Sequence, residues 1–189
     1  MLKVKPTNKI VTSVVTFTNA RIWEPEMILP GKEPLYTASI LIPKTDEKVI
    51  NGINIAVSGA IKLGSLKNTG KFAVEAKKNI PIYDGDDEKF DEMFRGYLIV
   101  NAASKIPPQI FDVNVFPITD SSLVQPGFKA RFSMSFVAYK KSKEDIGVAC
   151  VLGNIQKAYS QTDEQVLPDA NYDDFSKDFL RIFNLDETP

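Results

Sequence analysis

Apolar residues along this chain occur in short runs and in alternation, a pattern that predicts a mainly β fold. The stretch from Ile10 to Trp23 is rich in Val, Thr, Phe and Ile and has no glycine or proline, as is typical of a long strand. Pro25 and the loop from Pro30 to Pro34 separate it from a second strand at Leu35–Pro43. The two stretches predict an antiparallel hairpin.

Further strands are predicted in the second half of the chain. They cover Tyr97–Ala103, Gln109–Ile118, Phe128–Lys140 and Gly147–Gln156, with Pro107-Pro108 and Pro126-Gly127 between them. A short extended piece is also expected from Ile80 towards the acidic residues that end at Glu92. Several strands with turn-rich joints favour an antiparallel β-barrel, closed or partly closed, over a doubly wound sheet.

One helix is predicted between the second and third strands. Asp46 is a suitable N-cap, and Val49, Ile53, Val57 and Ile61 follow at helical spacing up to about Gly64. Residues 65–79 form a polar, basic connection for which the pattern predicts no definite structure. The expected fold is therefore a barrel with one inserted α-helix.

The C-terminal residues differ in character from the rest. From Thr162 onward, acidic residues and asparagine dominate, and then Phe175, Phe179, Ile182 and Phe183 recur at helical spacing. A helix of that length is marginal in water, so we expect a flexible segment that orders mainly when it docks. The chain is thus predicted to contain a domain at residues 1–160 and an acidic tail at residues 161–189.

Charge is divided along the chain in the same way. Residues 1–160 hold 21 Lys and Arg against 16 Asp and Glu, whereas the remainder holds 2 against 8. Six of the acids in the first part lie between Asp84 and Glu92, so the rest of that part is more basic still. A basic body with an acidic tail is typical of nucleic-acid binding, although surface lysines can also serve solubility alone.

Several classes of function are disfavoured by composition. The chain has no histidine, which removes Ser-His and Cys-His nucleophile pairs and imidazole metal sites. Any chemistry would have to use carboxylates and lysines, which favours a binding protein, and our prediction is no catalytic residue, metal or cofactor. No apolar run has the length of a membrane span or signal peptide, which predicts a soluble intracellular protein. The single cysteine, Cys150, is expected to be a buried apolar residue in a reducing compartment.

The strand Phe128–Lys140 carries the clearest indication of a binding face. Its even positions from Phe128 to Ala138 are apolar, so the odd positions, including Lys129, Arg131 and Tyr139, should point away from the core. Proteins that bind single-stranded nucleic acid combine cations with rings on which bases stack. Each candidate ring can instead be a core or rim aromatic. The further candidates for DNA contact are Arg21, Trp23, Tyr36, Lys44, Lys105, Phe111 and Lys140.

The tail supplies candidates for binding a protein partner. Asp173 and Asp174 precede the three phenylalanines Phe175, Phe179 and Phe183, so the segment combines negative charge with an apolar face. We expect the tail to compete weakly for the basic face of the body. Once DNA displaces it, the tail would become available to replication or recombination proteins.

Two other classes of function remain open from the residues alone. Asp84, Asp86 and Asp87 lie close together, and clustered carboxylates can hold Mg²⁺ for a nuclease. Consecutive acids in a turn rarely converge on one point, and the calcium-loop spacing is absent, so a solvated loop is the favoured interpretation. A virion or scaffold protein that assembles into oligomers is the other alternative.

Five stretches in order carry a resemblance to a known family. They are Pro34–Lys44, Pro81–Asp86, Gly96–Ser104, Gly127–Arg131 and Gly147–Gln156. In them the chain resembles phage single-stranded-DNA-binding proteins of OB fold, a family first described as a domain of unknown function. The resemblance implies binding of single-stranded DNA during phage replication or recombination, in the cytoplasm of an infected bacterium, without catalytic residues.

One feature departs from the tails of cellular single-strand binders. Those tails end with an aromatic residue, whereas this chain ends Asp186-Glu187-Thr188-Pro189. We therefore do not expect the tail to dock by a terminal aromatic residue.

Overall fold

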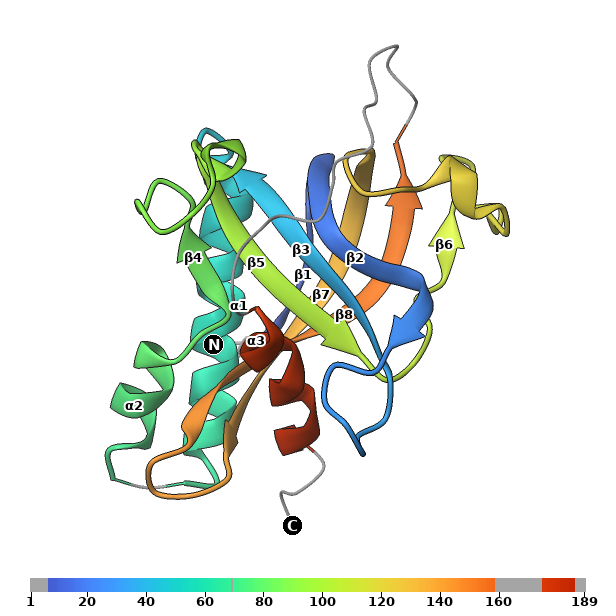
Figure 1. Ribbon diagram of the computed structural model, residues 1–189. Coiled ribbons are helices and arrows are strands. Elements are labelled where there is room, and N and C mark those ends of the chain that lie inside the picture. Colours follow the sequence, from blue (N-terminus) through green and yellow to red (C-terminus); the bar gives the residue numbers. More distant parts are fainter. Residues whose placement is uncertain (1–6, 69, 159–174, 186–189) are drawn as a thin grey trace, which may run out of the picture.

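The computed structural model describes residues 7–68, 70–158 and 175–185, and within them the fold is mainly β with few helices (Figure 1). The strands are β1 (Lys9–Val11), β2 (Val15–Glu26), β3 (Leu35–Pro43), β4 (Ile82–Asp84), β5 (Tyr97–Ser104), β6 (Ile110–Phe111), β7 (Lys129–Lys140) and β8 (Ile146–Lys157). The α-helices are α1 (Glu47–Ser65), α2 (Phe72–Lys78) and α3 (Ser176–Leu180). Short 3₁₀ helices are η1 (Glu92–Phe94), η2 (Ser121–Leu123) and η3 (Arg181–Leu185).

The strand pairings form a closed circuit. β7 pairs with β2, β2 with β3, β3 with β5, β5 with β8, and β8 again with β7. β1, β4 and β6 add to β7, β5 and β8. The sheet is mixed, because β8 runs parallel to β5 and to β6. The prediction of a purely antiparallel sheet was wrong, since a circuit of five strands cannot alternate direction at every pair.

The core lies inside this circuit and under α1. The inward side chains of β7 include Phe132, Met134 and Phe136, and Phe17 of β2 meets Phe132 edge-to-face with ring centroids 5.1 Å apart. α1 packs along β7 with its buried residues, which include Ile53 and Ile61. Cys150 is buried as expected, and burial raises the pKa of its thiol. The even positions of Phe128–Lys140 thus face the core, as predicted.

The predicted helix and hairpin are confirmed. The side chain of Asp46 accepts a hydrogen bond from the amide of Val49 at 3.1 Å, which caps α1 one residue before its start. β3 has the predicted bounds and pairs antiparallel with β2.

Three predicted elements differ from the structure. The connection 65–79 contains the helix α2, so two helices are inserted rather than one. The stretch Ile10–Trp23 is two strands, because Thr12 turns its side chain into the ladder, where its hydroxyl accepts a hydrogen bond from the amide of Phe132 at 3.0 Å. The strand predicted at Gln109–Ile118 is only β6, because Asp112 starts a tight turn by accepting the amides of Asn114 and Phe116.

A second apolar cluster lies on the outer side of β3 and β5. Leu41 of β3 and Ile99 of β5 point away from the core towards Phe90 and Phe94 of the loop between β4 and β5. Residues 175–185, which we call the docked segment, complete this cluster with Phe175, Phe179 and Ile182. In Figure 1 the docked segment, in dark red, lies across β5 and β8.

Two glycines of α1 predict opposite effects of the same substitution. A Cβ on Gly59 would lie 2.0 Å from the carbonyl oxygen of Thr7, so Gly59→Ala should lower the free energy of unfolding by about 1–3 kcal/mol. A Cβ on Gly52 would meet only the flexible end of Ile10, so Gly52→Ala should range from neutral to about 1 kcal/mol more stable. Urea denaturation of both variants measures the difference; equal effects would contradict it.

Candidate nucleic-acid interface

The docked segment lies between the loop 27–34, which joins β2 to β3, and the loop 141–145, which joins β7 to β8. Leu29 and Lys32 of the first loop and Lys141 of the second line the same hollow as Arg181 and Phe183. Phe175 stands against three other rings, with centroids 5.9 Å from Tyr83, 6.1 Å from Phe90 and 6.3 Å from Phe94. The aromatic residues predicted to meet a partner therefore pack on the chain's own body.

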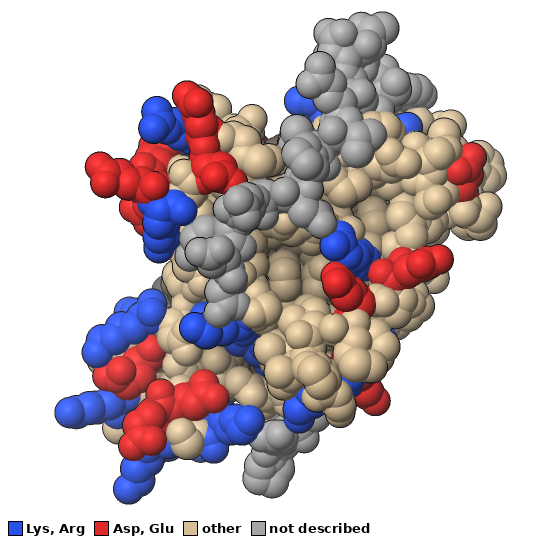
Figure 2. Space-filling model, in the orientation of Figure 1, with Lys and Arg blue, Asp and Glu red and all other residues tan. Residues whose placement is uncertain are grey.

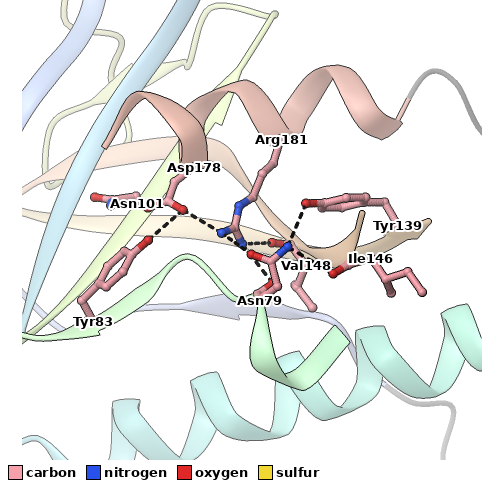
Figure 3. A network of polar contacts seen from close by, with 8 residues as sticks. All are labelled: Asn79, Tyr83, Asn101, Tyr139, Ile146, Val148, Asp178 and Arg181. Carbon is pink, nitrogen blue, oxygen red and sulfur yellow. Dashed lines mark hydrogen bonds and ion pairs between the residues drawn. The ribbon is translucent and has the colours of Figure 1, made fainter. Parts of the chain in front are cut away.

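A buried carboxylate fixes the docked segment in place (Figure 3). Asp178 of α3 is 4% exposed and accepts hydrogen bonds from the hydroxyl of Tyr83 at 3.0 Å and the side-chain amide of Asn101 at 2.8 Å. Arg181, one turn further along, places its guanidinium 3.0 Å from the same carboxylate. A buried charge is tolerated only when paired and hydrogen-bonded, and here β4, β5 and the segment itself supply the partners.

Arg181 also joins the docked segment to α2 and β8. Its guanidinium donates to the backbone carbonyls of Asn79 and Val148, both at 3.0 Å, and to the side-chain oxygen of Asn79 at 2.6 Å. Asn79 in turn donates to the carbonyl of Ile146 at 3.1 Å and to the hydroxyl of Tyr139 at 3.4 Å (Figure 3). One arginine thus closes a network that joins α3 and η3 to β4, β5, β7 and β8.

Tyr139 shows what the docked segment covers. Its position in β7 is in phase with Lys129 and Arg131, which places it on the outer side as predicted, yet the residue is 3% exposed. The hollow that it lines is formed otherwise by Lys177, Leu180, Arg181 and their neighbours, and burial raises the pKa of its hydroxyl. The outward ring of Tyr139 is therefore buried by a segment distant in sequence.

Two lysines meet a ring of the docked segment. The ammonium groups of Lys32 and Lys105 lie 5.4 and 4.9 Å from the centroid of the Phe183 ring. Lys105 is also 3.6 Å from the carboxylate of Glu33. These are cation–π contacts between the body and the docked segment. We call the surface under the docked segment, which includes Tyr139, Lys32 and Lys105, the covered face.

The structure places three other candidates at the edge of the core or of the covered face. Trp23 packs partly against the core, and its indole nitrogen donates to the carbonyl of Val124 at 2.8 Å. Tyr36 also packs partly against the core. Arg21 pairs with Glu26 at 2.8 Å and lines a hollow beside Phe175 and Phe179, at the edge of the covered face.

The remaining candidates lie elsewhere. Phe111 and Arg131 line one groove together on the outer side of β8 and β7, and Lys129 is exposed two residues from Arg131. Lys140 lines a hollow beside the end of α1. The ten predicted DNA-contact residues are thus not brought together at one site.

Lys44 forms ion pairs with acidic residues at the end of β4 and in the loop that follows it. Its ammonium contacts the carboxylates of Asp84 and Asp86, the latter at 2.5 Å, and Asp86 also accepts the amide of Gly96 at 2.7 Å. The hydrogen bonds from Lys44 lower the pKa of both carboxyls and raise that of Lys44. No group of three or more potential metal ligands occurs among the described residues.

Charge on the face of Figure 2 is distributed unevenly. Acidic side chains gather over the loop between β4 and β5 with basic ones beside them, and both signs are interleaved around α2. A continuous basic strip, which the charge count favours, is not visible on this face. Asp173 and Asp174 of the predicted partner motif lie outside the described residues. None of the described helices has the length and hydropathy needed to cross a membrane.

Sequence reasoning found the apolar positions of the docked segment but missed Asp178 and Arg181. Asp178 and Arg181 are three residues apart in the same amphipathic stretch, a spacing that indicates an ion pair on one side of a helix. Asn101 was the second signal, because a lone amide in the apolar strand Tyr97–Ser104 requires a buried hydrogen-bond partner. Neither signal alone identifies which residues meet.

Comparisons with known proteins bear on this arrangement. A family model described as "Enterobacter phage Enc34, ssDNA-binding protein" matches residues 8–175. A structure of the single-stranded DNA-binding protein from bacteriophage Enc34 aligns with a TM-score of 0.65 at 16% identity, covering 92% of this chain and 94% of that one. The same phage protein in complex with ssDNA gives 0.64 at 18%, covering 89% and 97%.

A more distant phage protein has a similar fold. The structure of gp2.5, a single-stranded DNA binding protein encoded by bacteriophage T7, aligns with a TM-score of 0.54 at 16% identity, covering 85% of this chain and 98% of that one. A search among curated protein sequences gave no match.

The ion pairs of Lys44 predict a pH-dependent contribution to stability. Since the folded pKa values of Asp84 and Asp86 are lowered below 3.8, their contribution is present above that pH and is lost as pH falls through the lowered values. Lys44→Gln should therefore melt below the unsubstituted chain at pH 7, and the difference should shrink below about pH 4. Thermal denaturation across pH measures it, with the exposed Lys48→Gln as the control. A difference that persists at pH 2 would contradict the assignment.

Proposed function

Since the chain belongs to the family of the Enterobacter phage Enc34 ssDNA-binding protein, we propose that it binds single-stranded DNA without sequence preference and protects it during phage replication or recombination. The place of action would be the cytoplasm of the infected bacterium. The fold is that of phage proteins whose descriptions name ssDNA binding, one of them in complex with ssDNA. We further propose that the protein is not an enzyme and uses no cofactor.

The architecture supports an OB-type barrel. The order β2-β3-β5-β8-β7, closed by β7 on β2 and with β5 and β8 parallel, is the five-stranded closed circuit that such a barrel requires. OB folds bind oligonucleotides across the outer side of their second and third strands, between two loops. Here those strands are β3 and β5, and the loops are 27–34 and 141–145. We propose residues 1–160 as the binding domain, with a site of a few to about 16 nucleotides.

One observation carries the proposal. The chain's own docked segment lies on the surface where an OB fold would hold single-stranded DNA. Phe183 lies against the ammonium groups of Lys32 and Lys105, and Tyr139 is buried beneath the same segment. A base would replace Phe183, phosphates would approach Lys105, Lys32 and Arg21, and Tyr139 would become a stacking ring. The covered face therefore has the cations and the aromatic ring that single-strand binding needs.

The tail then acts as an inhibitor in cis. Its docked part holds Lys177, Asp178 and Arg181, so it is not acidic, and it is held by apolar rings and a buried ion pair. Competition with DNA would thus depend mainly on occupancy of the covered face rather than on charge repulsion. This differs from the electrostatic competition expected from composition.

Displacement by DNA would make the tail available to a partner. Undocking exposes Phe175, Phe179 and Phe183, with Asp173 and Asp174 next to them in sequence. An acidic segment with an apolar face suits an amphipathic groove on a replication or recombination protein. A partner would therefore bind the tail when DNA occupies the body.

Binding of labelled oligonucleotides tests the proposed function directly. Fluorescence anisotropy of a labelled oligo-dT should show binding that weakens steeply with salt, because phosphate contacts release counterions. A duplex of equal length should bind more weakly, since its bases are stacked and unavailable. Equal binding of both, or none at about 50 mM salt, would contradict the proposal. Oligonucleotide cleavage dependent on Mg²⁺ would favour a nuclease.

Two single substitutions distinguish the effect of docking on DNA affinity from the effect of the tail's negative charge. Asp178→Ala removes a buried charge and leaves Arg181 unpaired, which should undock the segment and strengthen oligo-dT binding, as should deletion of residues 162–189. Asp169→Ala removes the same charge elsewhere in the tail and should change little.

Salt provides a second comparison for the same variants. If docking is mainly apolar, the ratio of affinities between Asp178→Ala and the unsubstituted chain should change little between about 50 and 200 mM salt, although both affinities fall. Equal effects of the two substitutions, or a ratio that disappears with salt, would show that charge competition dominates.

A further inference from the structure

A groove on the outer side of the β7–β8 hairpin lies away from the docked segment. Its walls are Val11 of β1 on one side and Phe111 and Val115 on the other, with Arg131, Ser133 and Asn154 between them. In Figure 1, β6 and the loop that follows lie at the upper right, well separated from α3 in the lower centre. The docked segment contributes no residue to this groove.

Large apolar side chains are exposed at the groove and beside it. Val115 and Val11, which line the groove, are 64% and 59% exposed, and Phe116, which follows Val115 in the chain, is 67% exposed. Single exposed apolar residues are ordinary, but several that border one groove on a folded domain mark a binding surface. Phe111, half-buried at the wall, adds a second ring five residues before Phe116.

The loop that carries Phe116 is held in a costly conformation. Val115 has φ of 66°, which is unfavourable for a β-branched residue. Asp112 maintains it, because its carbonyl accepts the amide of Val115 at 3.1 Å and its carboxylate accepts the amide of Phe116 at 2.9 Å. The amide of Asp112 donates to the carbonyl of Phe116 at 2.9 Å. The exposed ring is therefore presented by a closed, hydrogen-bonded turn.

A β-bulge shapes the floor. Phe132 is opposite Ile155 and Met134 opposite Leu152, so Gly153 and Asn154 both face Ser133. The amide of Asn154 donates to the hydroxyl of Ser133 at 2.7 Å, and a Cβ on Gly153 would lie 2.3 Å from that hydroxyl. Bulges of this kind bend a strand and redirect side chains at functional surfaces.

Charge determines which occupant fits. Arg131 and Lys9 line the groove and its continuation along β1, and no Asp or Glu does so among the described residues. The Nε of Arg131 donates to the carbonyl of Thr12 at 3.2 Å, which fixes the guanidinium at the wall. Exposed rings, cations and no acid favour an anionic occupant with flat apolar groups, which describes unpaired nucleotides.

We propose that this open groove is a second single-strand-binding surface, in which Phe116 and Phe111 stack on bases and Arg131 holds phosphate. The inference rests on the proposed function and deepens it. Because the docked segment leaves this surface uncovered, the strand would be captured here first and would then displace the docked segment from the covered face. Lys129, exposed beside Arg131, extends the cationic wall.

Removal of one exposed ring tests the second surface. Phe116→Ala in the full chain should weaken oligo-dT binding about 5-fold or more, the range for loss of one base stack, and Phe116→Trp should restore it. An abasic oligonucleotide of the same length should bind both chains equally, since it offers no base. The control is Leu66→Ala, which removes a side chain that is 78% exposed at the end of α1. Phe116 has little packing to lose, so folding should be unaffected.

The outcomes separate this inference from the proposed function. Unchanged oligo-dT binding by Phe116→Ala, with normal binding by the unsubstituted chain, overturns the second surface alone. A change in oligomeric state by light scattering, with unchanged DNA affinity, overturns it in favour of contact between two copies of the chain. Failure of both the unsubstituted chain and Asp178→Ala to bind any oligonucleotide overturns both proposals.

Discussion

The carboxylate of Asp178 is the constraint on which the arrangement of body and tail depends. A charge that is 4% exposed cannot remain without partners, and its partners come from Tyr83, Asn101 and Arg181. Because the first two belong to β4 and β5, the short helix α3 has one position and one register on the body. The apolar rings on either side then fall on the outer cluster of β3 and β5 rather than in solvent.

That position decides which surface the body presents. Phe183 and Arg181 of the docked segment lie on the covered face, whereas no residue of that segment lines the groove beside β6. Under the proposed function, the chain would combine a surface that opens when the docked segment leaves with a second surface that this segment does not cover. Composition describes a basic body and an acidic tail, whereas the contacts describe occupancy of one face by apolar and aromatic side chains.

Local patterns predicted much of the fold. The Asp46 cap, the bounds of Leu35–Pro43 and the alternation in Phe128–Lys140 each depend on neighbours in sequence, and each is confirmed. The errors had two causes, a contact distant in sequence and a local turn that the apolar pattern does not show. Thr12 breaks a continuous apolar run by bonding to Phe132, and Asp112 stops a strand by capping the turn after β6. The helix α2 was missed because its seven residues, four of them apolar, span less than two full repeats of a helical pattern.

The candidate site was less predictable, because its residues meet only through tertiary contacts. Alternation correctly placed Tyr139 on the outer side of β7, but no local pattern indicates that Arg181, forty-two residues later, would cover it. Lys44 appeared as a rim cation because its sequence neighbours do not reveal that Asp84 and Asp86 fold onto it.

The same limit applies to the charge of the tail, whose acids are visible in the sequence while their contacts are not. All but one of its eight acids lie outside the docked segment, whose single carboxylate is neutralised within the fold. In the proposed function these acids would tune the competition with DNA, while the apolar rings and the buried pair of Asp178 and Arg181 hold the docked segment in place. An inhibitor of this kind would keep its position when salt screens the surface, and would yield to a ligand that fills the same face.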